Sequence, residues 1–237
     1  MSNSYFQFKK FTVWQDQCAM KVGTDGVLLG AWTDIGNSRR ILDIGTGTGL
    51  IALMLAQRSK ALIDAIDIDL DACQQARSNI AKSPFTDRIQ VYHTPLSEYK
   101  PLTDEKYDRI VSNPPYFTET LKCPEDKRRI ARHADTLTLP HLLERSRKLL
   151  APEGRLALIL PYDHHDILMN QAEKESLFLY RETTVSSRSG LKPIRLLVEL
   201  ATYPTKEIRS SSLFLETEDH QYTDTFTTLV KDFYLKM

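Results

Sequence analysis

Short apolar runs alternate along this chain with longer stretches in which apolar residues recur at helical spacing. The apolar runs predict β-strands at residues 40–44, 61–67, 88–93, 107–112 and 154–160. The stretches between them predict helices: one opened by a glycine-rich turn within residues 45–59, and others at residues 70–82, 138–150 and 163–175. Regular alternation of strand and helix is typical of a parallel sheet built from βαβ units, so the pattern predicts an α/β fold.

The last third of the chain changes pattern. Two long runs, 177–187 and 194–203, flank the turn "SGLKP", which predicts an antiparallel hairpin. A short strand, an acidic loop and an amphipathic helix follow. The fold class expected is therefore a Rossmann-like, doubly wound, mostly parallel seven-stranded sheet with an antiparallel C-terminal hairpin. We expect one domain at 1–237, divided into an N-terminal extension at 1–38, a core at 39–203 and a C-terminal extension at 204–237.

Composition narrows the functional classes. The 237 residues carry 31 basic and 31 acidic side chains, so any nucleic-acid site must be a local basic patch on a neutral protein. The three cysteines form no CxxC pair, which indicates a reducing compartment and gives no support for a disulfide framework or a metal site. No apolar run approaches the roughly 20 residues that span a bilayer, so we expect no membrane partner and a cytoplasmic location.

A glycine-rich turn joins the first predicted strand to its helix in "LDIGTGTGL". Gly45, Gly47 and Gly49 let the backbone approach a ligand closely, and the helix that follows offers free N–H groups. Asp67 ends the next predicted strand, where a carboxylate can accept hydrogen bonds from ribose hydroxyls. The alternative is a plain tight turn. The acid on the second strand favours a nucleotide-containing cofactor.

The spacing of the loop separates two kinds of cofactor. Dinucleotide-binding loops read G-x-G-x-x-G, whereas this loop reads G-x-G-x-G with Asp43 ahead of it. An acid at Asp43 disfavours a pyrophosphate and suits a cationic amino-acid group. The "D-x-G-x-G-x-G" pattern resembles the first motif of the S-adenosylmethionine-dependent methyltransferases, and this resemblance implies S-adenosyl-L-methionine as the cofactor.

The fourth predicted strand ends in "SNPPY". The Asn113 side-chain oxygen and the Pro114 carbonyl can accept hydrogen bonds from a planar NH2 group, while two prolines fix the backbone. Tyr116 can stack on a base, at roughly 1–3 kcal/mol. The alternative is an Asn-Pro turn with an incidental tyrosine. The pattern resembles the fourth motif of methyltransferases that act on adenine N6, cytosine N4, guanine N2 or glutamine amides.

Longer sequence segments distinguish one methyltransferase family from another better than these short motifs do. "MKVGTDGVLLGAW", "NPPYF" and "ARHADTLTL" resemble the tRNA1(Val) adenine-N6 methyltransferases, which modify the adenine 3′ to the anticodon, and the likeness runs over essentially the whole chain. The resemblance implies N6-methylation of adenine in tRNA, with the anticodon stem-loop as partner. It implies catalytic roles for Asn113, Pro114, Pro115 and Tyr116. It implies cofactor contacts from Lys21, Thr24, Asp25, Asp43, Gly45, Gly47, Gly49, Asp67, Ile68 and Leu96.

Basic residues cluster after the NPPY motif and again around the "SGLKP" turn. They could hold RNA phosphates beside a flipped-out adenine, although a solvated charged loop is the alternative. The residues expected to contact substrate RNA are Phe117, Lys122, Arg128, Arg129, Arg132, Arg188 and Lys192.

One departure and several rival functions remain at this stage. Many methyltransferases place an acid after the third strand to contact the cofactor adenine, whereas this chain offers "HTPLS" at 93–97. A glutamine-amide methyltransferase shares the NPPY motif but usually carries a helical N-terminal domain. A guanine-N2 rRNA methyltransferase is usually a longer, duplicated protein. A non-catalytic RNA- or nucleotide-binding module would not need an intact NPPY. The sequence does not set the oligomeric state.

Overall fold

A computed structural model describes residues 3–18, 20–115 and 137–237. The main sheet contains β3 (Arg40–Ile44), β4 (Leu62–Asp67), β5 (Ile89–His93), β6 (Tyr107–Ser112), β7 (Leu150–Pro161), β8 (Phe178–Ser186), β9 (Arg195–Ala201) and β10 (Arg209–Phe214). The helices are α1 (Thr24–Trp32), α2 (Leu50–Arg58), α3 (Leu70–Ala81), α5 (Leu139–Leu149), α6 (His165–Lys174) and α7 (Asp224–Val230), with a 3-10 turn at Tyr162–His164. A separate hairpin is formed by β1 (Tyr5–Gln7) and β2 (Thr12–Trp14).

The strand order confirms the predicted fold class. The sheet runs β10-β8-β9-β7-β6-β3-β4-β5, with β3 to β7 mutually parallel where they pair and β9 antiparallel to both of its neighbours. The sheet exceeds the expected seven strands by one within the described residues, because the short tail strand β10 pairs in parallel with β8 at the edge.

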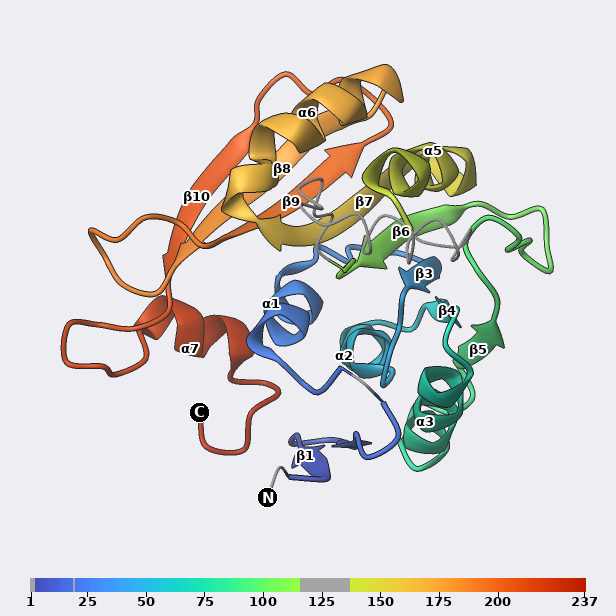
Figure 1. The fold of residues 1–237 in the computed structure, drawn as a ribbon, viewed down its shortest axis with the longest axis horizontal. Helices are drawn as coiled ribbons and strands as arrows, with labels where there is room; N and C mark the ends of the chain where they lie inside the picture. The colour runs from blue at the N-terminus through green and yellow to red at the C-terminus, as the bar shows by residue number, and fades with distance from the viewer. Residues whose placement is uncertain (1–2, 19, 116–136) are drawn as a thin grey trace, which may run out of the picture.

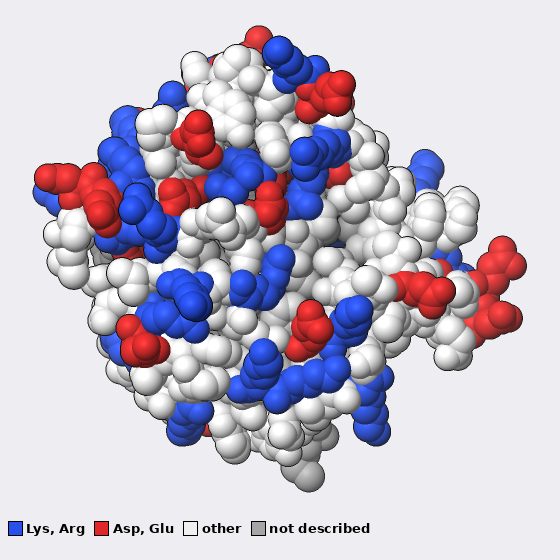
Figure 2. Space-filling model, turned by 180° about the vertical axis from the view of Figure 1, so that it is seen from behind, with Lys and Arg blue, Asp and Glu red and all other residues white. Residues whose placement is uncertain are grey.

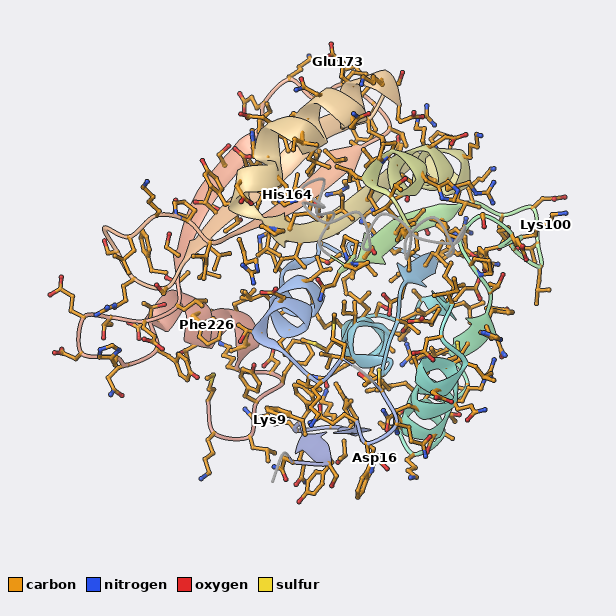
Figure 3. The ribbon with its side chains drawn as sticks, viewed as in Figure 1. Lys9, Asp16, Lys100, His164, Glu173 and Phe226 are labelled. Atoms are coloured by element: carbon orange, nitrogen blue, oxygen red, sulfur yellow. The ribbon has the colours of Figure 1, made fainter. Side chains whose placement is uncertain are left out.

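Helices cover both faces of the sheet (Figure 1). One apolar cluster joins α1, α2, α3 and α7 to the sheet, and Phe226 of α7 is buried in it (Figure 3). The other cluster joins α5 and α6 to the opposite face. Neighbouring residues of one strand, such as Ile41 and Leu42 in β3, are buried in different clusters. The strands are therefore continuously apolar because both of their faces are covered.

The order of the strands creates a switch point between β3 and β6. From β3 the chain passes outward to β4 and β5, whereas β6 begins the half of the sheet that continues through β7, β9 and β8. In open parallel sheets, ligands bind at the carboxyl ends of the strands where the order reverses in this way. The glycine loop follows β3 and Asn113 follows β6, so the topology brings the two motifs to the same place.

The hairpin β1–β2 packs against the C-terminal segment, on the side where both termini lie (Figure 1). Phe8 forms an isolated antiparallel bridge with Tyr234, and the backbone N–H of Lys9 donates to the carbonyl of Phe233 at 2.8 Å. The rings of Phe8 and Tyr234 stack with centroids 6.0 Å apart. Residues from the two ends of the described chain therefore form one contact.

Figure 2 shows the face of the molecule that is hidden in Figure 1. Charges of both signs are mixed on this face, and Lys and Arg gather over its lower half. This mixing agrees with the net charge of zero. In the parts of the chain that the structure describes, the helices are too short or too polar to cross a bilayer.

Candidate active site

The glycine loop forms an open cradle at the end of β3. Gly45 and Gly47 have positive φ angles of 71° and 55°, which L-residues with side chains rarely adopt. The N–H groups of Gly45 and Thr46 both donate to the carbonyl of Ile66, at 2.9 and 3.0 Å, and tie the loop to β4. A Cβ atom at either glycine would meet no atom within 4 Å. The space beside the loop is therefore open to a ligand.

Asp67 is held by backbone groups at the end of β4. One carboxylate oxygen accepts the Gly47 N–H at 2.8 Å, and the other accepts the Asp69 N–H at 2.9 Å. The side chain is half-buried and lines a cavity. Because each carboxylate oxygen can accept a second hydrogen bond, Asp67 can bind a pair of hydroxyl groups from that cavity.

Asp43 is fully buried beneath the glycine loop and, contrary to expectation for a direct cofactor contact, lines neither cavity. Its Oδ2 accepts the Thr46 hydroxyl at 2.7 Å and the Ala52 N–H at 3.2 Å, whereas Oδ1 has no hydrogen-bond partner among the described residues. Burial, with a smaller contribution from the Asp67 charge, raises the pKa of the Asp43 carboxyl to about 7. A nearby cation would stabilise its ionised form.

Two adjoining cavities of about 480 Å³ each lie at the switch point. Both are lined by Met20, Gly45, Gly47, Asn113 and Pro115. The first extends towards α1 and β9 and is also lined by Lys21, Thr24, Asp25, Pro114, Ile194 and Arg195. The second extends over β4 and is also lined by Asp67, Ile68, Thr94, Leu96, Ser97, Leu137 and His141. The shared residues stand at the junction, so a ligand lying across both cavities would pass Asn113.

Asn113 is fixed at this junction by the end of β6. The Ser112 hydroxyl donates to the Ile44 carbonyl at 2.8 Å and joins the last residues of β6 and β3. Asn113 itself is half-buried, and Pro114 behind it is buried. The side chain therefore meets the cavities directly after the hydrogen-bonded end of β6, with a buried proline next to it.

Sequence reasoning missed several lining residues. Arg195 at the start of β9 forms an ion pair with Asp25 in the first turn of α1, with Nε and Oδ2 2.8 Å apart. Met20, Ile194 and His141 also line the cavities. These residues come from segments far apart in the sequence, and only the second basic group around "SGLKP" pointed to one of the regions.

Other predicted residues lie elsewhere. Gly49 is the residue that precedes α2 and packs against α3, and it does not line either cavity. Arg188 and Lys192 lie in the turn between β8 and β9, outside the cavity walls. The remaining predicted residues lie outside the described part of the chain: Tyr116, Phe117, Lys122, Arg128, Arg129 and Arg132. Within residues 3–18, 20–115 and 137–237, no group of three or more His, Cys, Asp or Glu side chains is placed to hold a metal ion.

The strand order and the paired motifs at the switch point define an enzyme of the Rossmann-like methyltransferase class. Residues 21–171 match the Methyltransferase small domain family. The fold is also similar to the crystal structure of "a predicted O-methyltransferase" from Agrobacterium tumefaciens, with a TM-score of 0.67 at 19% identity over 88% of this chain and 96% of that one.

Sequence relatives narrow the class. The chain is 63% identical to a tRNA1(Val) (adenine(37)-N6)-methyltransferase from Parabacteroides distasonis over the full length of both proteins. It is 48% identical to the protein of the same name from Bacteroides fragilis, again over the full length of both. The chain belongs to the tRNA1(Val) (adenine(37)-N6)-methyltransferase family.

Proposed function

We propose that this protein transfers a methyl group from S-adenosyl-L-methionine to N6 of adenine 37 in tRNA1(Val). The carrying observation is the position of Asn113, which lines both cavities beside the glycine loop. The names of the full-length relatives support the choice of adenine and of this tRNA.

The residues around the second cavity fit the adenosine part of such a cofactor. Asp67 offers acceptors for the two ribose hydroxyls, and the apolar side chains of Ile68 and Leu96 stand on the cavity wall where an adenine ring can lie. Thr94 and Ser97 supply hydroxyls where many methyltransferases have an acid. In this proposal, these hydroxyls take the place of the acid that "HTPLS" lacks.

The residues around the glycine loop fit the amino-acid part. The open sides of Gly45 and Gly47 allow close approach, and the buried Asp43 lacks a cationic partner in the described protein. Lys21, Thr24 and Asp25 form the facing wall. The cofactor, when bound, supplies a methyl group on a positively charged sulfur, which is the electrophile of the reaction.

Asn113 and Pro114 prepare the nucleophile. The lone pair of an aromatic amine is delocalised into the ring, so the free amine attacks poorly. Two acceptors, the Asn113 Oδ1 and the Pro114 carbonyl, favour a pyramidal nitrogen with its lone pair directed at the methyl group. Since both acceptors are already fixed by β6 and its proline, little ordering is needed on binding. We extend the proposal to Tyr116 as the stacking ring and to Arg188 and Lys192 as phosphate contacts.

The test measures methyl transfer from radiolabelled S-adenosylmethionine to unmodified tRNA1(Val) transcripts, followed by nucleoside analysis. Wild type is compared with Asn113→Ala and with Asn170→Ala, a matched control on the exposed surface of α6. A transcript with guanine at position 37 tests the site.

We expect label in N6-methyladenosine for wild type and Asn170→Ala. Asn113→Ala should be slower by a factor on the order of 10², since a displaced amine loses alignment with the methyl group. Label that persists with guanine 37 would contradict the proposed position. Label in a protein glutamine, with none in RNA, would contradict the proposed substrate class.

A further inference from the structure

Residues from Trp14 to Gly23, which we name the strap, connect β2 to α1 (Figure 1), and residue 19 lies outside the described part. The strap ends in the cavity wall, because Met20, Lys21 and Gly23 all line the first cavity. Among its described residues the strap has no strand partner beyond Trp14, apart from one backbone hydrogen bond from the Gln15 N–H to the Ser4 carbonyl at 2.9 Å. Its position must therefore be set by other contacts.

Three buried side-chain amides supply those contacts. Gln75 of α3 accepts the Gln17 N–H at 3.0 Å, and Gln15 accepts the Val22 N–H at 2.7 Å. Asn79 of α3 accepts the Trp14 N–H at 2.9 Å and donates to the Trp14 carbonyl at 2.8 Å. Asn79 thus pairs with Trp14 as a neighbouring strand would.

Asn79 also reaches the glycine loop. The second hydrogen of its amide donates to the Thr48 carbonyl at 2.9 Å, so both N–H groups are used. The side chain is 0% exposed, where an unpaired polar group would be costly. The Asn79 side chain therefore forms hydrogen bonds with both the strap and the glycine loop.

We propose that Asn79 is a positioning residue for methyl transfer, which fixes the strap relative to the glycine loop and so sets the width of the cavity that takes the amino-acid part of the cofactor. This inference rests on the proposed function. It assigns a role to a residue in the last turn of α3 that lines neither cavity.

The substitution Asn79→Asp isolates this role. A carboxylate keeps the acceptor for the Trp14 N–H, but it turns an oxygen towards the carbonyls of Trp14 and Thr48 and loses both donated hydrogen bonds. Gln75→Ala frees the strap at Gln17 without touching the glycine loop. Ser83→Ala is the structural control, because Ser83 is buried just beyond α3 and its hydroxyl donates to Ile80 at 2.8 Å.

The measurements are the Kd of S-adenosylhomocysteine by calorimetry, KM for S-adenosylmethionine, kcat, thermal unfolding, and hydrogen exchange at the amides of Trp14, Gln17 and Val22. For Asn79→Asp we expect Kd and KM to rise about tenfold with kcat nearly unchanged. Exchange at Trp14 should be faster, and saturation with S-adenosylhomocysteine should slow it. Gln75→Ala should accelerate exchange at Gln17 only, and Ser83→Ala should lower the Tm alone.

A wild-type Kd and KM in Asn79→Asp, with only the loss of Tm that Ser83→Ala shows, would overturn the inference. Should Asn79→Asp fail to fold, Asn79→Ala carries the same expectation without the repelling carboxylate. A wild-type protein that binds no S-adenosylhomocysteine would instead overturn the proposed function itself. The two failures are therefore distinguishable.

Discussion

Buried carboxylates in two regions of the central sheet are compensated differently. In β9, Glu199 is 0% exposed and pairs with Arg155 of β7 at 3.1 Å and with Arg181 of β8 at 3.0 Å. Asp64, in the amino-terminal half of β4, pairs with Arg40 at 2.7 Å and accepts the Tyr107 hydroxyl. At the end of β3, by contrast, the hydrogen-bond donors to Asp43 within the described residues are a hydroxyl and a backbone amide.

This difference distinguishes a carboxylate that stabilises the fold from one whose charge a bound ligand would compensate. A buried carboxylate is costly unless a cation or several donors compensate it. Arginines meet that need for Glu199 and Asp64. For Asp43 the raised pKa shows that the need is only partly met. A cationic ligand at the switch point would compensate Asp43 as the arginines compensate Glu199 and Asp64.

The largest effect is expected from Glu199→Gln. Removing this charge leaves the guanidinium groups of Arg155 and Arg181 without their shared partner, which we expect to lower the free energy of unfolding by about 3 kcal/mol. Urea unfolding measures this loss. The rate of methyl transfer per folded molecule should match wild type, and a rate that falls in proportion to stability would break the distinction between Glu199 and Asp43.

A matched pair on β4 sharpens the comparison. Asp67→Asn weakens the acceptors at the carboxyl end, and we expect about a tenfold rise in the Kd of S-adenosylhomocysteine, as for one charge-assisted hydrogen bond. Asp64→Asn changes the same strand at the other end and should lower the Tm without changing that Kd. Calorimetry measures the Kd of both variants, and thermal unfolding measures their Tm. Equal Kd values in the two variants would contradict the role of Asp67 in ligand binding.

Asp43 gives a smaller, pH-dependent effect. Because the pKa of Asp43 is raised in the folded protein, its protonated form favours folding at low pH. The Tm of wild type relative to Asp43→Asn should therefore fall as the pH rises from 5 to about 7 and then level off. S-adenosylhomocysteine carries an ammonium group, so its affinity should increase over the same range in wild type only. A parallel pH profile in both proteins would exclude Asp43 as the titrating group.

The smallest effect is expected at the rim of the site. Lys192→Ala removes an exposed charge from the β8–β9 turn and should weaken tRNA binding a few-fold, lowering the slope of log K against log salt by about 0.7 to 0.9. Lys60→Ala, which removes an exposed charge between α2 and β4, is the control. Filter binding at several salt concentrations measures both, and identical slopes would remove Lys192 from the RNA surface.

The sequence predicted the groups that follow directly on strand ends. The glycine loop, Asp67 and Asn113 could be placed because apolar runs locate the strands and parallel strands share a carboxyl edge. The sequence did not place Arg195 or Met20 in the cavity wall. The position of Arg195 depends on how α1 packs against the hairpin β8–β9, and the position of Met20 depends on the contacts of the strap.

The positions of the buried polar residues were harder to predict than those of the cavity-lining residues. Asn79 and Gln75 sit on an amphipathic helix where a polar residue usually faces solvent, and the chain gives no local sign that the strap covers them. Glu199 did leave a sign, a charge inside the apolar run "LLVEL", but its arginine partners come from two other strands. The tail pattern predicted β10 as a short strand but not its pairing with β8, because nothing local specifies a parallel partner.

The contact between Phe8 and Tyr234 orders events during synthesis of the chain. The ribosome releases the β1–β2 hairpin before the strands of the sheet, but the segment around Phe233 and Tyr234 that contacts this hairpin follows β10 and emerges after those strands. Until then the hairpin that leads into the strap lacks one of its supports. A nascent chain can thus assemble the sheet and its glycine loop early, while the adjoining wall of the cavity is secured only after the segment beyond β10 has been translated.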